Sequence, residues 1–189
     1  MEEKTSMRIE TARLVLRDYC PEDMDTYYRM KTDPTVWKDS TEQPVGHWGQ
    51  AAKALGDILS AQLSTGTGYR AVCLRGGPMI GEAGILRLSH AHNRCRIGCN
   101  LLPEYWNRGY GTEIFRLLLR LAFPVLQLER AEAAALADNI GACRALEKAG
   151  FQREGLLRNR HCQSGRYRDL CVYGIVSREY AASPPRWGE

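Results

Sequence analysis

The stretch RIGCNLLPEYWNRGYGTEIFRLLLRLAF, residues 96–123, decides the fold of this chain. Its beginning completes an extended, largely apolar run over 94–102, which predicts a strand. In its second half, apolar residues recur at helical spacing until Pro124, which marks the end of a helix. Between the two lies a turn that contains Gly109 and Gly111. The stretch therefore predicts a strand joined to a helix by a glycine-rich turn.

The glycine-rich turn is suited to bind an anion. A helix N-terminus leaves backbone N–H groups unpaired and carries the positive end of the helix dipole. Glycines ahead of it let the backbone approach a ligand closely, and Arg108 adds positive charge. A phosphate or pyrophosphate group fits this site; the alternative is a tight loop without a ligand. The pattern is neither a Walker loop, since no G-K-[ST] follows, nor the dinucleotide fingerprint, since the third glycine is missing.

The rest of the chain alternates strand and helix patterns. Strands are expected at 13–19, 69–75, 79–89, 94–102, 130–136, 151–160 and 166–176. Helices are expected from Pro21 to about Lys31, from about His47 to Leu63, from the glycine-rich turn to Pro124, and over 139–150. The run at 130–136 has helical propensity, but its place between two helices favours a buried strand. This order predicts a mixed α/β sheet protein.

A second informative stretch is NIGACRALEKAG, residues 139–150. Asn139 is a good N-cap, apolar residues follow on one face, and Gly150 is a typical C-terminal stop. Alone, the stretch predicts only a capped amphipathic helix. It becomes informative about function only when it is considered together with the glycine-rich turn.

Length and composition indicate one domain, which we place at 8–180 with flexible termini at 1–7 and 181–189. No apolar run approaches the roughly 20 residues of a membrane-spanning helix, and the charged start lacks a secretory signal. The seven cysteines are scattered and odd in number, which suits a reducing compartment. We therefore expect a cytoplasmic protein that does not bind membranes.

The net charge of +4 is only mildly basic and favours an anionic ligand slightly. No Lys/Arg block or basic helix is present, so nucleic acid is not an expected partner.

The segments IGCNLLPEYWNRGYGTE and DNIGACRALEKAGFQREG together resemble the GNAT acetyltransferase superfamily, and within it the RimJ/RimL branch of ribosomal-protein alanine N-acetyltransferases. The start IETARLVLRDYCPEDMDTYYRM is similar to the opening of that branch, and the resemblance spans about residues 8–176. It implies a single-domain GNAT fold with a mixed, largely antiparallel sheet of about seven strands and helices on both faces. It also implies an acetyl-CoA-dependent N-acetyltransferase that is a monomer or homodimer.

The resemblance also assigns the cofactor site. In the family, the strand before the turn splays from its neighbour, and acetyl-CoA lies in the opening. By resemblance, backbone groups of Asn100, Leu101 and Leu102 would pair with pantetheine, and Leu102 would hold the thioester oxygen. The pyrophosphate would be bound by N–H groups of the turn residues Arg108, Gly109, Tyr110, Gly111 and Thr112. From the next helix, Asn139 would reach the pantetheine arm, and Arg144 or Lys148 a phosphate or the adenine.

The chain departs from the family pattern at four positions. Trp106 stands where the superfamily usually has Gln or Arg, although the RimJ/RimL branch commonly has Trp. Leu146 replaces the tyrosine that in many members protonates the thiolate. Ala142 and Arg96 stand where this branch often has serine and glutamate. The sequence therefore names no general acid.

The expected chemistry is direct attack of a neutral amine on the thioester, favoured by proximity and by backbone N–H stabilisation of the oxyanion. An α-amine has a pKa near 7.7–8.0, and a lysine-like amine one near 10.4, a difference worth roughly 3 kcal/mol. A site without a strong base therefore suits a protein or peptide α-amine. The candidate bases are Glu82, within an expected strand, and the loop residue Glu104; a solvent-facing strand position is the alternative for Glu82.

Other functions stay open at this point. The acceptor could be a small amine such as a polyamine, an amino acid or an aminoglycoside, and the chain could be a CoA-binding module without catalysis. The residues His90, His92, Cys95 and Cys99 are close in sequence, but their spacing is not that of a zinc finger or ribbon, so no metal is expected. The early aromatic residues Tyr27, Tyr28, Trp37 and Trp48 could line an acceptor groove or pack in the core.

Overall fold

The computed structural model describes residues 8–38, 40, 44–61, 67–163 and 165–182. Eight strands form one sheet in the spatial order β1-β2-β3-β4-β5-β6-β8-β7. They are β1 (Arg8–Glu10), β2 (Leu14–Arg17), β3 (Gly68–Leu74), β4 (Met79–Ser89), β5 (Arg94–Leu101), β6 (Arg130–Leu136), β7 (Gln152–Gln163) and β8 (Arg166–Val176). Neighbouring strands are antiparallel except β5 and β6, which are parallel. The expected mixed, largely antiparallel sheet is confirmed.

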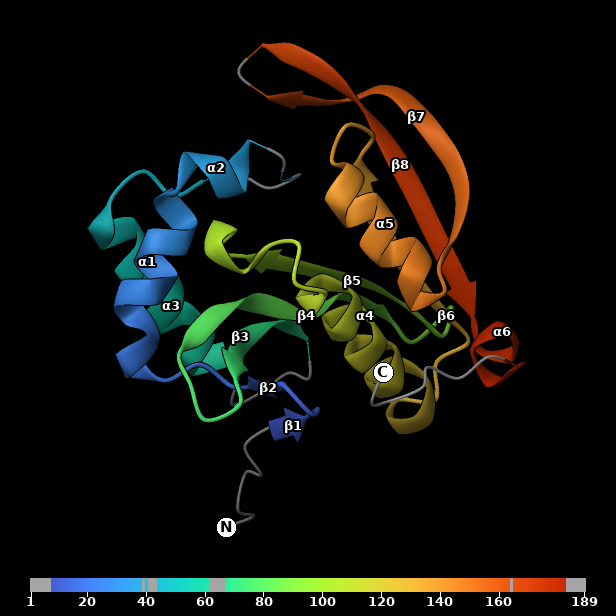
Figure 1. Ribbon diagram of the computed structural model, residues 1–189, viewed down its shortest axis with the longest axis horizontal. Helices are drawn as coiled ribbons and strands as arrows, with labels where there is room; N and C mark the ends of the chain where they lie inside the picture. Colours follow the sequence, from blue (N-terminus) through green and yellow to red (C-terminus); the bar gives the residue numbers. More distant parts are fainter. Residues whose placement is uncertain (1–7, 39, 41–43, 62–66, 164, 183–189) are drawn as a thin grey trace.

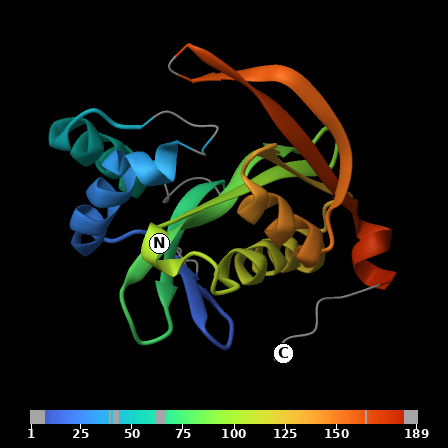
Figure 2. The same cartoon turned by 45° about the horizontal axis from the view of Figure 1, so that its top comes forward.

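Helices cover both faces of this sheet (Figures 1 and 2). They are α1 (Met24–Thr32), α2 (Pro34–Trp37), α3 (Trp48–Ala61), α4 (Tyr110–Arg120), α5 (Ile140–Ala149) and α6 (Ser177–Ala182). Two short 3-10 helices, η1 (Pro21–Asp23) and η2 (Pro103–Tyr105), and one π-helical segment, η3 (Leu121–Val125), also form among the described residues. Helices α1, α2 and α3 lie on one face, and α4 and α5 on the other. In the described part of the chain, no helix is both long and apolar enough to cross a membrane.

The period of two along the strands divides the core between the two faces. Leu14 and Leu16 of β2 pack with the apolar side of α4, whereas Val15 between them packs with α1, α2 and α3. On the face that α4 covers, α5 contributes its buried apolar residues to the same hydrophobic cluster. The expected amphipathic stripes of α4 and α5 are therefore the faces that these helices bury.

Three short elements were not expected. β1 adds an eighth strand where about seven were expected, and it pairs with β2 through Ile9 and Leu16. α2 is a single turn capped by Asp33. α6 extends to Ala182, so residues 181 and 182, which were expected in the flexible terminus, are helical. Such short elements carry too few residues to show a period. The expected termini at 1–7 and 183–189, and the helix end near Leu63, lie outside the described residues.

Candidate active site

A cavity of about 1010 Å³ opens where β5 and β6 separate. Their parallel ladder has only three pairs and ends at Arg96 opposite Glu132. Beyond that pair, Ile97–Leu101 of β5 form one wall, and Ala133–Ala135 of β6 form the other. The starts of α4 and α5 close the cavity on one face of the sheet. The predicted separation of this strand from its neighbour is therefore present.

The strand register decides which peptide groups face this opening. The Leu102 N–H donates to the Ile80 carbonyl at 2.9 Å, and Leu101 lies opposite Gly81. In an antiparallel ladder, alternate residues direct both peptide groups to the same neighbour. The peptide groups of Asn100 and Leu102 are therefore directed to β4, which corrects their expected backbone contact with pantetheine. Those of Cys99 and Leu101 face the opening instead.

The glycine-rich turn lies at the edge of the cavity as predicted. Gly109 is the N-cap of α4 with φ of +79°, a conformation that favours glycine. Gly109, Tyr110, Gly111 and Thr112 line the cavity, and the first N–H groups of α4 have no carbonyl within the helix to bind. Arg108 is not part of the wall, and its guanidinium lies 6.0 Å from the Tyr105 ring centroid. The turn therefore lies where the predicted anion site would be, and the Arg108 side chain is not part of that wall.

Residues before β2 hold this turn in place, a contact that the sequence did not reveal. Arg13 Nε donates to Glu113 of α4 at 2.7 Å, and the Arg13 guanidinium lies 4.7 Å from the Tyr110 ring centroid. Arg13 also donates to the Arg108 carbonyl at 3.1 Å. Thr11 donates its hydroxyl to Glu113 at 2.5 Å. These bonds give a structural role to the threonine and arginine of the segment IETARL.

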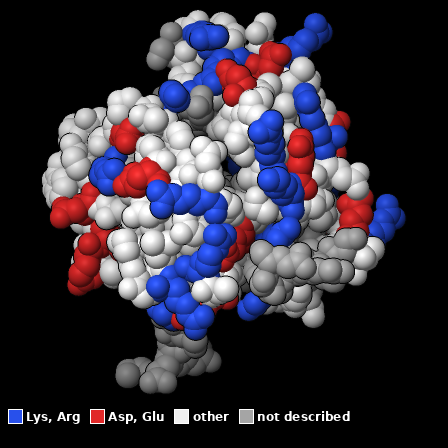
Figure 3. Space-filling view, viewed as in Figure 1, with Lys and Arg blue, Asp and Glu red and all other residues white. Residues whose placement is uncertain are grey.

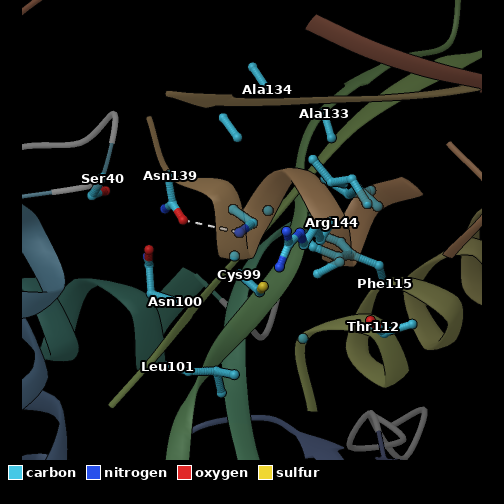
Figure 4. A pocket seen from close by; sticks show the side chains of 18 of the residues that line it. Ser40, Cys99, Asn100, Leu101, Thr112, Phe115, Ala133, Ala134, Asn139 and Arg144 are labelled. Carbon is cyan, nitrogen blue, oxygen red and sulfur yellow. Dashed lines mark hydrogen bonds between the residues drawn. The ribbon is translucent and has the colours of Figure 1, made fainter. Parts of the chain in front are cut away.

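On α5, Asn139 accepts a hydrogen bond from the Ala142 N–H at 3.0 Å, so the predicted N-cap is confirmed (Figure 4). Asn139, Arg144 and Lys148 all line the cavity. Among the described residues, no carboxylate forms an ion pair with Arg144 or Lys148. These two cations are therefore available to an anionic ligand.

The charge of the cavity wall is strongly unbalanced. The basic side chains of its described part are Arg87, Arg96, Arg144, Lys148 and Arg160, and the one carboxylate is Asp138. Arg168 Nε donates to Asp138 at 3.0 Å, and this bond lowers the pKa of that carboxyl below its usual value. Figure 3 shows Lys and Arg side chains gathered over α5 and the nearby start of α4. The wall therefore favours an anionic ligand and offers no unpaired carboxylate in its described part.

Glu82 of β4 is fully buried and is not part of the cavity wall, so the solvent-facing alternative is wrong. Its carboxylate accepts hydrogen bonds from Lys31 Nζ at 2.6 Å, Tyr19 Oη at 2.7 Å and Asn100 Nδ2 at 2.9 Å. Only Asn100 of these partners lines the cavity. Glu82 therefore contacts the site through the Asn100 amide. The other candidate, Glu104, forms an ion pair with Arg29 at 2.8 Å outside the cavity wall.

The described residues provide little support for a nucleophilic cysteine or for a metal site. Cys99 lines the cavity, but burial, with a smaller effect of Glu82, raises the pKa of its thiol to about 12. It therefore stays protonated near neutral pH and is a poor nucleophile. No three His, Cys, Asp or Glu side chains cluster as metal ligands in the part of the chain that is described.

Sequence reasoning missed the part of the wall that β7 contributes. The β7–β8 ladder shifts register between Leu157 and His161, where Asn159 has φ of +50°. This bulge places Arg160 and His161 at the cavity. His161 Nε2 is shielded from solvent and has no hydrogen-bond partner among the described residues. The expected aromatic residues Tyr27, Tyr28, Trp37 and Trp48 are not in the wall, whereas Tyr69 is.

Comparisons with known proteins agree with this geometry. A family model described as Acetyltransferase (GNAT) domain matches residues 13–152. The uncharacterized N-acetyltransferase YoaA of Bacillus subtilis is 30% identical over 89% of this chain and 96% of its own length. Spermidine N(1)-acetyltransferase of Escherichia coli is 25% identical over 88% of both chains. The crystal structure of spermidine N-acetyltransferase from Vibrio cholerae with CoA and spermine has a TM-score of 0.80 at 18% identity, covering 90% of this chain and 99% of that one.

Proposed function

Because the chain belongs to the GNAT acetyltransferase family and is an N-acetyltransferase, we propose that it transfers the acetyl group of acetyl-CoA to the α-amine of a protein or peptide N-terminus. This acceptor is the one that the RimJ/RimL-like motifs imply. The observation that carries the proposal is the charge of the cavity wall, whose described part has five basic side chains and one carboxylate that is already paired.

A polyamine carries several positive charges, and a site that selects it needs carboxylates to balance them. The wall of this cavity has the opposite balance. The phosphates of CoA account for part of the basic surface, since Arg144 and Lys148 lie on α5 beside the glycine-rich turn. Arg160, from the β7 bulge, is a further positive charge that a polycationic acceptor would approach. This charge balance supports an acceptor with a single amine.

The absence of an unpaired carboxylate from the described wall also bears on proton removal. A lysine-like amine is almost fully protonated at neutral pH, whereas a substantial fraction of an α-amine is neutral. Glu82 was the first candidate base, but its two oxygens already accept hydrogen bonds from the buried Tyr19 and Lys31 and from the partly buried Asn100. In this proposal Glu82 is a partner of Asn100 rather than the direct base. An acceptor that needs little help to lose its proton fits such a site.

In the proposed complex the pyrophosphate of acetyl-CoA lies at the N–H groups of Gly109–Thr112, near Arg144 and Lys148. The pantetheine arm runs along the open edge of β5, where the peptide groups of Cys99 and the N–H of Leu101 face it; the Leu101 carbonyl accepts a hydrogen bond from Trp106 Nε1 at 2.8 Å. The Leu101 N–H, rather than that of Leu102, then donates to the thioester oxygen as negative charge develops on it. The amine nitrogen forms a bond to the acetyl carbon, the carbon–sulfur bond breaks so that CoA leaves as its thiolate, and the amine releases one proton to water.

The second candidate acceptor is a polyamine, which the similarity to a spermidine N(1)-acetyltransferase favours. The test measures thiol release from acetyl-CoA with peptides that begin with Ala or Ser, blocked peptides that contain lysine, spermidine and an aminoglycoside, with product masses confirmed. The proposal expects kcat/KM for unblocked peptides to exceed that for spermidine by about tenfold or more. Faster turnover of spermidine than of any peptide would refute it.

A further inference from the structure

We propose that the side-chain oxygen of Asn100 binds the acceptor amine, and that the buried Lys31–Glu82 ion pair is a positioning element that directs this oxygen into the cavity. The inference rests on the N-acetyltransferase activity but not on the identity of the amine. It differs from the sequence-based expectation, which gave Asn100 a backbone contact with pantetheine.

The chemistry of Glu82 fixes the orientation of the Asn100 amide. A carboxylate paired with a lysine has only hydrogen-bond acceptors, so the Asn100 group 2.9 Å from Glu82 Oε1 is the amide nitrogen. The Asn100 oxygen is then on the side of the amide away from Glu82. No described residue donates a hydrogen bond to this oxygen, and Asn100 lines the cavity. Figure 4 shows the Asn100 side chain directed toward that of Asn139 across the opening.

The ion pair behind Asn100 is rigid because it is enclosed. Glu82 has no exposed surface and Lys31 only 8%. Lys31 Nζ lies between 5.1 and 5.4 Å from the ring centroids of Trp37, Tyr27 and Tyr69. Burial and the neighbouring Glu82 raise the pKa of Tyr19 well above its usual value, so its hydroxyl remains a donor. Glu82 therefore has little freedom to move, and neither has the amide that it binds.

The position of Asn100 suits an amine about to attack the thioester. The peptide group of its neighbour Leu101 faces the opening where the pantetheine arm is proposed to lie. The side chain of Asn100 shares the face of the sheet that carries Glu82, Lys31 and Tyr19, opposite the face covered by α4. An amine that enters from the α1–α3 side would meet the Asn100 oxygen before it reaches the acetyl carbon.

A neutral amide is also the appropriate partner for a nucleophilic amine. A carboxylate beside the amine would favour its protonated form, which cannot attack. An amide oxygen accepts an N–H from either protonation state and carries no net charge. Asn100 can therefore hold the amine without raising its pKa strongly.

The test compares Asn100→Ala with the control Gln152→Ala. Both wild-type side chains donate an amide N–H to a carboxylate at 2.9 Å, but Gln152 binds Glu179 on the exposed side of β7, away from the cavity. Steady-state kinetics would use the amine that the wild-type enzyme acetylates fastest, and calorimetry would measure acetyl-CoA affinity. We expect Asn100→Ala to raise KM for the amine about tenfold, with acetyl-CoA affinity unchanged and Gln152→Ala indistinguishable from wild type.

A double variant, Lys31→Met with Glu82→Gln, tests the positioning role. A glutamine at position 82 can present either its oxygen or its nitrogen, so the Asn100 amide would lose its single orientation. We expect a smaller rise of KM, about threefold, with acetyl-CoA affinity again unchanged. Should Asn100→Ala unfold the protein, Asn100→Ser keeps a small polar side chain and is expected to raise KM in the same way.

An unchanged amine KM in Asn100→Ala, or a loss confined to acetyl-CoA affinity, would overturn the inference. Turnover of spermidine but not of peptides would refute the proposed acceptor, while the role of Asn100 would then be tested with spermidine. Absence of turnover with every amine would refute both.

Discussion

The assignment of the pyrophosphate to the start of α4 is tested most directly at Gly111. A Cβ added there would lie 3.5 Å from the Ala145 Cβ, an ordinary contact, and the backbone of Gly111 is helical. A side chain is therefore tolerated, and removing a glycine from a helix stabilises the fold by up to about 1 kcal/mol. An aspartate in the first turn also interacts favourably with the helix dipole. Gly111→Asp should consequently fold at least as well as the wild type.

The same carboxylate would lie beside the proposed pyrophosphate. With an effective dielectric constant of about 20 near a protein surface, two like charges about 6 Å apart repel by about 3 kcal/mol, which corresponds to roughly 100-fold weaker binding. Calorimetric titration with acetyl-CoA would compare Gly111→Asp with the isosteric Gly111→Asn and with wild type, and thermal unfolding without ligand would report stability. We expect the Asp variant alone to lose this affinity, and to regain part of it at high salt. Equal affinities of the Asp and Asn variants would show that no phosphate lies at Gly111.

Three further predictions follow from other contacts. Asn139→Ala should lower the free energy of unfolding by about 1 kcal/mol through loss of the cap and also weaken acetyl-CoA binding. A loss of stability without any change in acetyl-CoA affinity would show that Asn139 only caps the helix. Arg168 lowers the pKa of Asp138, so their ion pair stabilises the fold above the ordinary aspartate pKa of about 4 and loses this effect as the pH falls through the lower pKa of the folded state. The free energies of unfolding of wild type and Asp138→Asn, measured by chemical denaturation, should therefore differ by less than about 1 kcal/mol at pH 7 and converge below about pH 4. A difference that increased in acid would contradict this prediction. Lys31→Met alone should lower the free energy of unfolding by about 3–5 kcal/mol, because it leaves the Glu82 charge buried and unpaired. Adding Glu82→Leu should recover much of that loss in chemical denaturation. Equal stability of the single and double variants would refute this expectation.

Much of the fold could be predicted because its long elements repeat with a clear period. The strand at 94–102, the glycine-rich turn and the helix after it lie where their residue pattern indicates. Elements of three to six residues, such as β1, α2 and α6, could not be predicted in this way. Their formation depends on a neighbouring strand, a capping Asp33 or a packing partner, and none of these appears as a periodic pattern.

The position of the turn that we propose binds the cofactor was also largely predictable, because this turn is formed by residues adjacent in the chain. The exception is the alternation along β5. Which peptide groups face the opening depends on whether Leu102 or Leu101 pairs with β4, and the Leu102–Ile80 hydrogen bond settles it. A shift of one residue exchanges the two sides of a strand. No feature of the strand's own sequence specifies that choice.

By itself the sequence determined the glycine-rich turn and the capped helix after β6, because each depends on residues adjacent in the chain, and the mildly basic net charge, which depends on composition alone. Only the tertiary structure brought Lys31, Tyr19 and Glu82 together behind Asn100, and only it placed Arg13 against Glu113. Lys31 and Glu82 are 51 positions apart, and Arg13 and Glu113 are 100 apart. Contacts of this kind depend on how the strands pair and on how the helices pack against them, so the residues behind the proposed acceptor side could be identified only from the folded structure.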